Sequence, residues 1–426
     1  MLRIRHENMK NKYDNFSILT DFDNLYKSYM LCANGVRWKD GTARYSARAY
    51  ECTLYLKEHL LEGTFITKPR REFYVYEPKK RRIIASEFAE KVVQRCLCDK
   101  VIKPVLFTKV VYGNSASQKG KGQHFGLDHL TKCLRHYYRL HGTNGYVLKG
   151  DIRHYFPTME HEQIKQMFRR YFEDENILKI IDMTIDSWCD PDESQDDIKR
   201  GLALGFDLSQ ICGVFQLNEL DHYLLEQRKV HYYGRYMDDF FIIAETKEEL
   251  RDLKADIENK LKEYGHELNK KTQIFPISQG IDYLGFHTYI TSSGKVIRKV
   301  RQKSKNKQRR KLRKLKEFIK SGELTFEDVW ASYQSWRAHA MNGNSYYLIL
   351  NMDKYFDELF KEYLDETHQG FMNKPKSKKG NKKCRKQYHS YQMVQKSKTQ
   401  ERLISVPLLP GSKLEAELTE QTTQPF

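Results

Sequence analysis

The 426-residue sequence predicts an α+β fold in which helices surround a central set of antiparallel strands. Long segments such as 247–265 repeat apolar residues at helical spacing. Short apolar runs such as 146–152 are typical of buried strands. The runs 230–236 and 240–244 are separated only by a tight turn, which indicates an antiparallel hairpin.

The elements expected in the first third begin with helices. They are helices within 16–62 closed by Gly63, a β-hairpin over 71–86 with a basic tip, an amphipathic helix ending before Pro104, a Gly/Ser/Lys loop over 113–122, and a helix over 124–141. This order favours helices packed beside a basic hairpin.

The middle of the chain carries the strands. We expect a strand over 146–152, helices over 161–172 and 175–188, an acidic loop over 190–197, a helix over 209–227, the hairpin 230–244, a surface helix over 247–265 and a strand pair within 279–290. From Val300 a basic helix follows, with Leu312, Leu315, Phe318 and Ile319 on its apolar face. Two more helices follow over 326–343 and 345–366, and from Phe371 we expect little structure.

Composition argues against a membrane protein and a wholly disordered chain. Hydrophobic residues make up 39% and charged residues 31% of the sequence. No run of about 18 apolar residues occurs, and the first residues lack an apolar signal core. The eight cysteines form no CxxC pair. We therefore expect a cytoplasmic protein with reduced thiols and no membrane contact.

The net charge of +18 and the 13% of aromatic residues indicate a nucleic-acid partner. The charge is concentrated in two strips. Residues 295–320 hold 14 Lys/Arg and one Glu, and residues 373–398 hold ten Lys/Arg and no acid. Together the strips exceed the net charge, so the rest of the chain is mildly acidic.

Three carboxylates stand where strands end. Asp238 and Asp239 lie at the tip of the predicted hairpin, and Asp151 ends the apolar run 146–152. Acids at such positions need a compensating charge, and Mg²⁺ prefers oxygen ligands. Two metals roughly 3.5–4 Å apart would support in-line phosphoryl transfer. Because successive strand side chains alternate, Asp238 and Asp239 are not expected to be equal ligands unless the turn rotates one of them.

Phe156 follows Asp151 by five residues. An aromatic ring just past a metal-binding acid can wall off the sugar C2′ position and select deoxynucleotides. The alternative is that Tyr155 and Phe156 are both core residues, and the sequence leaves the two interpretations open.

Seven segments, in order, resemble the sequence blocks of prokaryotic reverse transcriptases. They are RRIIASEFAEKVVQRCLCDKVIKPV, SASQKGKG, GDIRHYFP, GLALGFDLSQICGVFQLNELD, YMDD, ELNKKTQ and DYLGF. The segment SWRAHAMNG is also similar to the thumb helix of these enzymes. The resemblance covers about residues 70–345 and implies an RNA-directed DNA polymerase that makes cDNA from an RNA template, a primer and dNTPs with two Mg²⁺ ions.

The resemblance implies a right-hand polymerase fold with fingers, an antiparallel palm flanked by helices, and a helical thumb. The implied domains are a helical extension over 1–65, fingers over 66–145, a palm over 146–290 with fingers helices inserted at about 160–200, a basic helical thumb over 291–368, and a basic, mostly disordered tail over 369–426.

Roles follow by resemblance at each position. The catalytic residues would be Asp151, Asp238, Asp239 and Lys271, with Lys271 a candidate proton donor to pyrophosphate and Ile152 joining the three acids in the metal site. The substrate-binding residues would be Phe156, Lys80, Arg82, Lys119, Lys121, Leu204, Gly205, Ser209 and Gln210. The primer grip would be Tyr283, Leu284, Gly285 and Phe286. Many relatives have Arg where this chain has Gln118, so the triphosphate contact is shared among the two lysines and the hairpin.

The pattern LGxxxSQ at residues 204–210 resembles the enzymes of diversity-generating retroelements, whereas group II intron enzymes read QGGxxSP. Leu204 in place of Gln removes a hydrogen-bonding group beside the nascent base pair, which predicts looser copying. Related phage-defence reverse transcriptases, which copy a dedicated non-coding RNA, carry similar blocks. A cognate structured RNA and an accessory protein are possible partners.

Two further alternatives are weaker. A catalytically silent RNA-binding scaffold would not require all three acids. An RNA-dependent RNA polymerase is disfavoured by Phe156 and by Tyr236-Met237 preceding the paired acids.

Overall fold

The computed structural model describes residues 12–67, 71–75, 81–190, 198–364, 368 and 370–371. Two compact units divide the chain, residues 1–368 and residues 369–426. The elements below belong to the first unit. The expected basic strip over 373–398 and most of the expected acidic loop over 190–197 lie outside the described residues.

The N-terminal part is helical, as the sequence predicts. It consists of α2 (Phe16–Leu19), α3 (Phe22–Ala33), α4 (Asp40–Ala47) and α5 (Ala49–Leu61). The Asp21 carboxylate accepts the backbone N–H of Asn24 and so caps α3. Contacts between α3 and α6 (Phe88–Cys96) join these helices to the rest of the first unit.

The predicted basic hairpin is present as β1 (Arg71–Val75) and β2 (Arg81–Ala85), paired antiparallel. The residues between the two strands, which include Lys80, lie outside the described part of the chain.

The expectation that a helix ends before Pro104 is wrong. After α6 the chain continues as a π-helical segment, Leu97–Ile102, and then as α7 (Lys103–Leu106), which contains Pro104. Proline normally breaks a helix because it lacks an N–H and its ring clashes with the carbonyl four residues earlier. The wider π-helical turn changes this geometry, since the N–H of Lys103 reaches back to the carbonyl of Cys98. The helical path can therefore pass through the proline.

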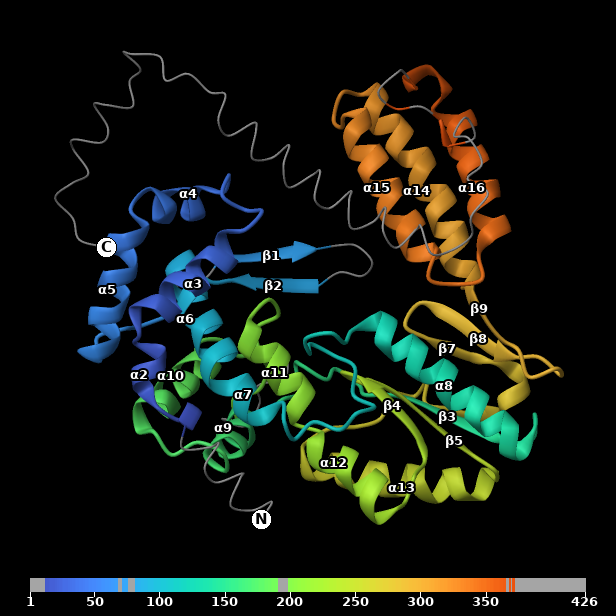
Figure 1. The fold of residues 1–426 in the computed structure, drawn as a ribbon, viewed down its shortest axis with the longest axis horizontal. Coiled ribbons are helices and arrows are strands. Elements are labelled where there is room, and N and C mark those ends of the chain that lie inside the picture. Colours follow the sequence, from blue (N-terminus) through green and yellow to red (C-terminus); the bar gives the residue numbers. More distant parts are fainter. Residues whose placement is uncertain are drawn as a thin grey trace. The chain divides into compact units, whose positions relative to one another are not determined.

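The central sheet has four antiparallel strands in the order β4-β5-β3-β6 and is drawn in the lower right of Figure 1. Its strands are β3 (Tyr146–Asp151), β4 (Tyr232–Tyr236), β5 (Asp239–Ala244) and β6 (Gln273–Pro276). Helix α13 (Lys247–Glu263) packs on the face carrying Leu148 and Ile242. Helix α8 (Gln123–His141) packs on the opposite face, with Val147 and Phe241. Both faces are buried, which explains the continuous apolar runs in these strands.

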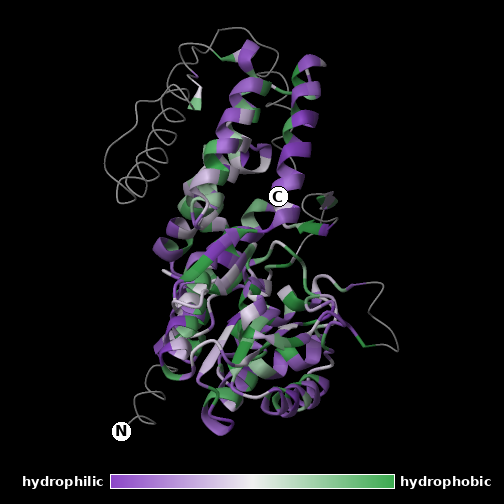
Figure 2. Ribbon diagram, turned by 90° about the vertical axis from the view of Figure 1, so that its right-hand side faces the viewer, coloured by the Kyte–Doolittle hydropathy of each residue, from purple (hydrophilic) through white to green (hydrophobic). Residues whose placement is uncertain are grey.

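Shorter helices share one hydrophobic core with Leu148, Ile242 and the π-helical segment. They are α9 (His161–Arg169), α10 (Glu175–Asp186), α11 (Asp207–Phe215) and α12 (Asn218–His222), the last followed by a π-helical turn, Tyr223–Gln227. The single helix expected over 209–227 is therefore three pieces. In Figure 2 the outer helices alternate between hydrophilic and hydrophobic colours along their length, as expected for one exposed and one buried face.

A second sheet has three strands, β7 (Ile281–Tyr283), β8 (Phe286–Ile290) and β9 (Val296–Val300). Only the first two were expected. The third falls inside the basic strip 295–320 and pairs with β8. The domain boundary drawn between residues 290 and 291 therefore falls within a strand pair.

Three helices follow the second sheet and pack together (Figure 1): α14 (Gln302–Lys320), α15 (Phe326–Ala340) and α16 (Tyr346–Leu359). Leu312 and Leu315 of α14 are buried, as the helical spacing predicts. Among the described residues no helix combines the length and the apolar character needed to cross a membrane.

Candidate active site

Two of the predicted acids end neighbouring strands of the central sheet. Asp151 is the last residue of β3 and Asp239 is the first of β5, and the two are direct partners in the antiparallel ladder. Such partners point to the same face of a sheet, with Cβ atoms about 4.5–5.5 Å apart. The backbone N–H of Ile152 donates to the carbonyl of Asp238 over 3.2 Å. The three acids and Ile152 therefore meet at one end of the sheet.

Met237 and Asp238 form the two-residue turn between β4 and β5. The φ angle of Met237 is 57°, in the left-handed region that non-glycine residues seldom adopt. The buried guanidinium of Arg235 donates to the carbonyl of Met237 over 2.9 Å and to that of Val214, in α11, over 2.8 Å. The surrounding structure thus holds the turn in a conformation that isolated methionine disfavours.

Burial raises the pKa of Asp238, and the negative charge of Asp151 raises it further. The positive charges of Lys149 and Arg81 oppose both effects. Asp151 and Asp238 therefore form a pair of carboxylates that repel each other, and a cation between them would relieve the repulsion.

Lys149 was not singled out from the sequence, although it lies next to the acids. It stands two residues before Asp151 on the same face of β3, and its ammonium contacts the carboxylate of Asp239. Burial lowers the pKa of Lys149 to about 8, against the opposing charges of Asp151 and Asp238. The signal available in the sequence was the alternation of the strand, which puts residues 149 and 151 on one face.

Among the described residues no group of three or more His, Cys, Asp or Glu side chains could hold a metal ion. Asp239 is engaged by Lys149, which leaves Asp151 and Asp238 as the converging pair. A pair is enough for Mg²⁺, which typically binds one or two carboxylates and completes its shell with phosphate oxygens and water. The residues present therefore fit Mg²⁺ bound together with a phosphate-bearing substrate.

Phe156 is half-buried beside α11 and the turn. A Cβ atom built on Gly213 would lie 2.8 Å from Phe156 Cζ and 3.2 Å from Met237 Sδ. The neighbouring Tyr155 is buried, and its hydroxyl donates to the carbonyl of Gly213 over 3.0 Å. The two rings therefore differ, because Tyr155 is a core residue and Phe156 remains partly accessible next to the acids.

The cations of the hairpin divide between its two faces. Arg82 donates to Glu72 over 2.8 Å and lies over the ring of Trp188, 5.7 Å from the ring centre. The Arg82 guanidinium, which the sequence analysis assigned to substrate binding, is therefore paired with Glu72. Arg81, which was not assigned, is exposed, and its charge acts on Asp238. Since neighbouring strand residues point to opposite faces, Arg81 and Arg82 lie on opposite faces of the hairpin, and the effect on Asp238 indicates that Arg81 is on the side of the acids.

The two predicted lysines of the Gly/Ser/Lys loop have different surroundings. Lys121 donates to the carbonyls of Tyr112 and Asn114 over 3.0 and 3.1 Å, and burial lowers its pKa. Lys119 is exposed. The loop itself is joined to β4, since the N–H of Ser115 donates to the carbonyl of Arg235 over 2.9 Å. Lys121 thus stabilises the loop, and Lys119 is the accessible cation.

The segment 204–210 lies against the hairpin. The N–H of Ile84 in β2 donates to the carbonyl of Leu204 over 3.3 Å, and Leu204 is half-buried. Gly205 is exposed with a φ of 117°, a conformation that favours glycine. Ser209 is buried and Gln210 is half-buried, both in the first turns of α11.

The four residues of the predicted primer grip differ in their exposure. Tyr283 and Phe286 are each 1% exposed and pack in the core beneath α8. Leu284 and Gly285 form the tight turn between β7 and β8, with φ angles of 45° and 89°. The half-buried turn residues are therefore the part of this motif that another molecule can contact.

Lys271 is exposed on the loop between α13 and β6, and another residue of that loop touches the acids. The side-chain amide of Asn269 donates from Nδ2 to Asp151 Oδ2 over 3.0 Å. The sequence offered no signal for this contact, because the two residues are 118 positions apart.

Comparison with known proteins gives a family match. Residues 66–288 match the family model described as reverse transcriptase (RNA-dependent DNA polymerase). A search of curated proteins found no match. Solved structures similar to this chain include apo telomerase from Candida tropicalis, truncated from its C-terminal domain, with 15% identity, a TM-score of 0.40 and coverage of 57% of this chain and 58% of that one. Telomerase from Candida albicans, in complex with a TWJ fragment of telomeric RNA, has 13% identity, a TM-score of 0.41 and coverage of 60% and 50%. This chain thus matches only 58% and 50% of the lengths of these two telomerase chains.

Proposed function

This chain belongs to the reverse transcriptase family, and we propose that it is an RNA-directed DNA polymerase that copies an RNA template into cDNA. The observation that carries the proposal is the convergence of Asp151, Asp238 and Asp239 at one sheet end inside the matched region. In this proposal the primer 3′-OH attacks the α-phosphate of a bound dNTP, and pyrophosphate leaves.

The acids have unequal tasks. Asp151 and Asp238, with the backbone of Ile152 beside them, would hold two Mg²⁺ ions. Bound Mg²⁺ supplies charge stabilisation for the attacking and leaving oxygens. Asp239 instead pairs with Lys149, and this pair reduces the net negative charge next to the metal-binding carboxylates.

Substrate selection would fall to groups around the acids. The ring of Phe156 would exclude a ribose 2′-hydroxyl. Arg81 and Lys119 are the accessible cations for the triphosphate, and their exposure supports this assignment over Arg82 and Lys121, which have partners within the protein. Lys271 remains the proposed proton donor to pyrophosphate, because it is exposed on the loop that contacts Asp151.

Template and primer would lie on either side of this centre. Leu204 and Gly205, beside the fingers hairpin, would face the templating base pair, and the Leu284-Gly285 turn would contact the primer end. The basic helix α14, which follows the second sheet directly, would bind the phosphates of the exiting duplex.

Among reverse transcriptases we favour an enzyme of a diversity-generating retroelement, acting in the cytoplasm. The apolar Leu204 is half-buried at its loop and offers no side-chain hydrogen bond to a base. A phage-defence enzyme is the second candidate, because related enzymes share this block. A nearby pair of repeats that differ mainly at adenines would favour the first role. A lone gene beside a structured RNA would favour the second.

Asp238→Ala provides the test of polymerase activity. The purified full chain, a structured RNA template, a primer, Mg²⁺ and dNTPs should give cDNA, and the variant should give none. Asp252→Ala, an exposed acid on α13, is the matched control and should retain activity. Equal cDNA synthesis by wild type and Asp238→Ala would refute the assignment, and binding of RNA without any synthesis by wild type would favour a silent scaffold.

The tail is tested separately. Deleting residues 371–426 should leave extension of a generic primer intact. It should reduce cDNA synthesis from a native structured RNA, or binding of an accessory protein. Equal losses with generic and native templates would contradict this division of labour.

A further inference from the structure

The loop between α13 and β6 is docked on the end of β3. The N–H of Asn269 donates to the backbone carbonyl of Asp151 over 2.7 Å, and the N–H of Arg153 donates to the carbonyl of Glu267 over 2.9 Å. Ile152 and Leu268 form an isolated bridge between these two contacts. The loop therefore runs along the residues at and after Asp151 as a short extra ladder, although it is distant in sequence.

The side chain of Asn269 has a defined orientation within this loop. Its Oδ1 accepts the backbone N–H of Lys271 over 3.1 Å, as in an Asx-turn. Only the amide oxygen can accept an N–H, so the amide nitrogen must face the other way. That nitrogen donates to Asp151 Oδ2 over 3.0 Å. Two independent contacts thus agree on which atom faces the acid.

The carboxylate of Asp151 has few hydrogen-bonding neighbours among the described residues. Among those residues Asn269 is the one side chain that donates a hydrogen bond to the Asp151 carboxylate. The hydroxyl of Thr272 lies 3.4 Å from both the backbone nitrogen and the carbonyl oxygen of Asp151, so it supports the main chain rather than the carboxylate. The orientation of the carboxylate therefore depends on the Asn269 amide.

We propose that Asn269 is the positioning residue of the metal-binding carboxylate. It holds Asp151 Oδ2 and leaves Oδ1 available to a metal ion bound together with Asp238. This inference rests on the proposed function, in which Asp151 binds Mg²⁺. Groups that orient a metal ligand in this way typically change metal affinity 10–100-fold when removed. The loop around Lys271 thus also fixes the geometry of the acid.

The test uses the full chain with a dideoxy-terminated primer on an RNA template and the next dNTP. Mn²⁺ is titrated into this complex, and free Mn²⁺ is followed by electron paramagnetic resonance. Asn269→Ala should weaken Mn²⁺ binding about tenfold or more. Asn269→Ser keeps an oxygen that can accept the Lys271 N–H but has no amide, so it should show the same loss. Asn259→Ala, the same change at an exposed position of α13, should bind like wild type.

Two further measurements separate positioning from general damage to the loop. The affinity for primer–template and the thermal midpoint should stay at wild-type values in both Asn269 variants. In steady-state extension the Mg²⁺ concentration for half-maximal rate should rise about tenfold, with kcat at saturating Mg²⁺ within about twofold of wild type. Wild-type Mn²⁺ affinity in Asn269→Ser would overturn the proposal, because the amide donor would then be unnecessary.

Failure of this inference is distinguishable from failure of the proposed function. If Asp151→Asn abolishes Mn²⁺ binding and synthesis while both Asn269 variants match wild type, only the positioning role is refuted. If Asp151→Asn changes neither quantity, the proposed function fails and the positioning role fails with it.

Discussion

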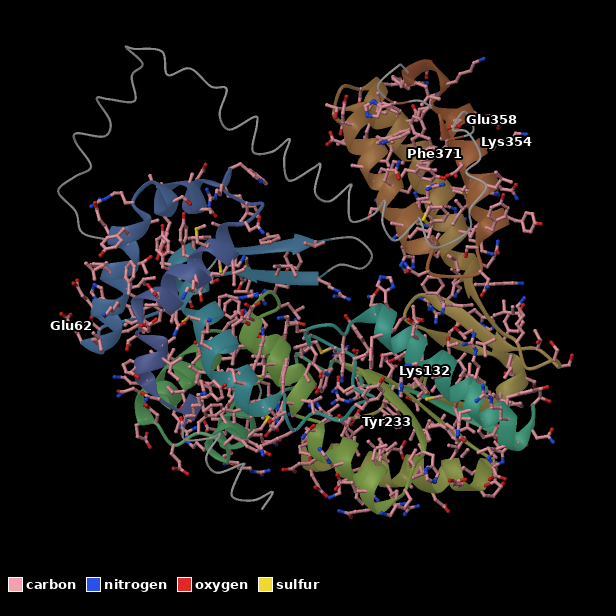
Figure 3. All side chains as sticks on the ribbon, viewed as in Figure 1. Glu62, Lys132, Tyr233, Lys354, Glu358 and Phe371 are labelled. Atoms are coloured by element: carbon pink, nitrogen blue, oxygen red, sulfur yellow. The ribbon has the colours of Figure 1, made fainter. Side chains whose placement is uncertain are left out.

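Arg235 and Asp221 form an ion pair that is almost completely buried, with side chains 1% and 0% exposed and 2.5 Å between Nη2 and Oδ2. The hydroxyl of Tyr233, labelled in Figure 3, also donates to Asp221. The same guanidinium holds the carbonyls of Met237 and Val214. One cation therefore joins β4, α11 and the turn that carries Asp238.

Asp221→Asn should destabilise the protein strongly. The substitution leaves the Arg235 cation buried without its counter-charge, which typically costs about 3–5 kcal/mol. Unfolding in urea, followed by circular dichroism, would measure the loss. Asp252→Asn on the exposed side of α13 should change the free energy of unfolding by less than about 0.5 kcal/mol. A small effect at Asp221 would mean that the pair contributes little to the fold.

Phe156→Ala should admit ribonucleotides. Truncating the ring removes the wall proposed to exclude the 2′-hydroxyl, so kcat/KM for an rNTP should rise relative to that for the matching dNTP. Single-nucleotide extension with each substrate would give the ratio. Unchanged rejection of rNTPs would show that the gate lies elsewhere. That outcome would leave the proposed polymerase activity itself untouched.

Gly213→Ala should act through Phe156. A methyl group at residue 213 would come within 2.8 Å of Phe156 Cζ, so the ring must move off α11. We expect the rNTP/dNTP ratio to change at least about fivefold, or roughly 1 kcal/mol. In a Phe156→Ala background the same glycine substitution should have no further effect on the ratio. An equal effect in both backgrounds would rule out the ring as the intermediary.

Features of this site that depend on neighbouring residues in the sequence could be predicted, and features that depend on tertiary packing could not. Asp151 and the paired acids stand at the ends of apolar runs, and the strand period predicted which faces their side chains take. The choice between Arg81 and Arg82 depends on which face of a hairpin meets the sheet, which depends on tertiary packing. Strand β9 was hidden because its alternating apolar residues lie within a charge run.

Contacts between distant segments could not be predicted at all. The pairing of Asn269 with Asp151 depends on how a loop docks on a strand end. The left-handed conformation of Met237 contradicts the preference of its own residue type and exists because Arg235 and α11 impose it. The helical path through Pro104 likewise needs a π-helical turn that local propensity does not reveal.

Acid should destabilise the fold through His266. Its ring is 1% exposed and hydrogen-bonded to Thr158 and Gln216, and burial lowers its pKa to about 4. The unfolded chain, with a histidine pKa of about 6.5, therefore takes up a proton first as pH falls from 6.5 toward 4, and stability is lost over that window.

Urea unfolding at pH 7 and pH 5 would measure this effect. The difference attributable to His266 should be about 2 kcal/mol. His266→Gln should lose that part of the pH dependence, whereas His231→Gln, at an exposed ring, should retain it. An unchanged pH dependence in His266→Gln would show that the buried ring does not cause the acid sensitivity.

Salt should weaken primer–template binding through α14. Lys303, Lys307 and Arg310 line a hollow of about 370 Å³ on this helix. Replacing all three by Ala should lower affinity and reduce the slope of log K against log salt concentration by about 2 to 3. Fluorescence anisotropy with labelled duplex would measure both. Replacing Lys247, Lys254 and Lys262 of α13 is the control and should leave the slope unchanged.

The order of strands in the central sheet also determines when, during synthesis of the chain, Asp151 gains its neighbouring strands. Strand β3 lies between β5 and β6, which are made about 90 and 120 residues later. A chain growing on the ribosome therefore holds Asp151 without its neighbours until β5 and then the Asn269 loop have emerged. Such distant pairings form slowly. The proposed catalytic centre is thus assembled late in synthesis, and translation products that stop before β6 should be inert toward nucleotides.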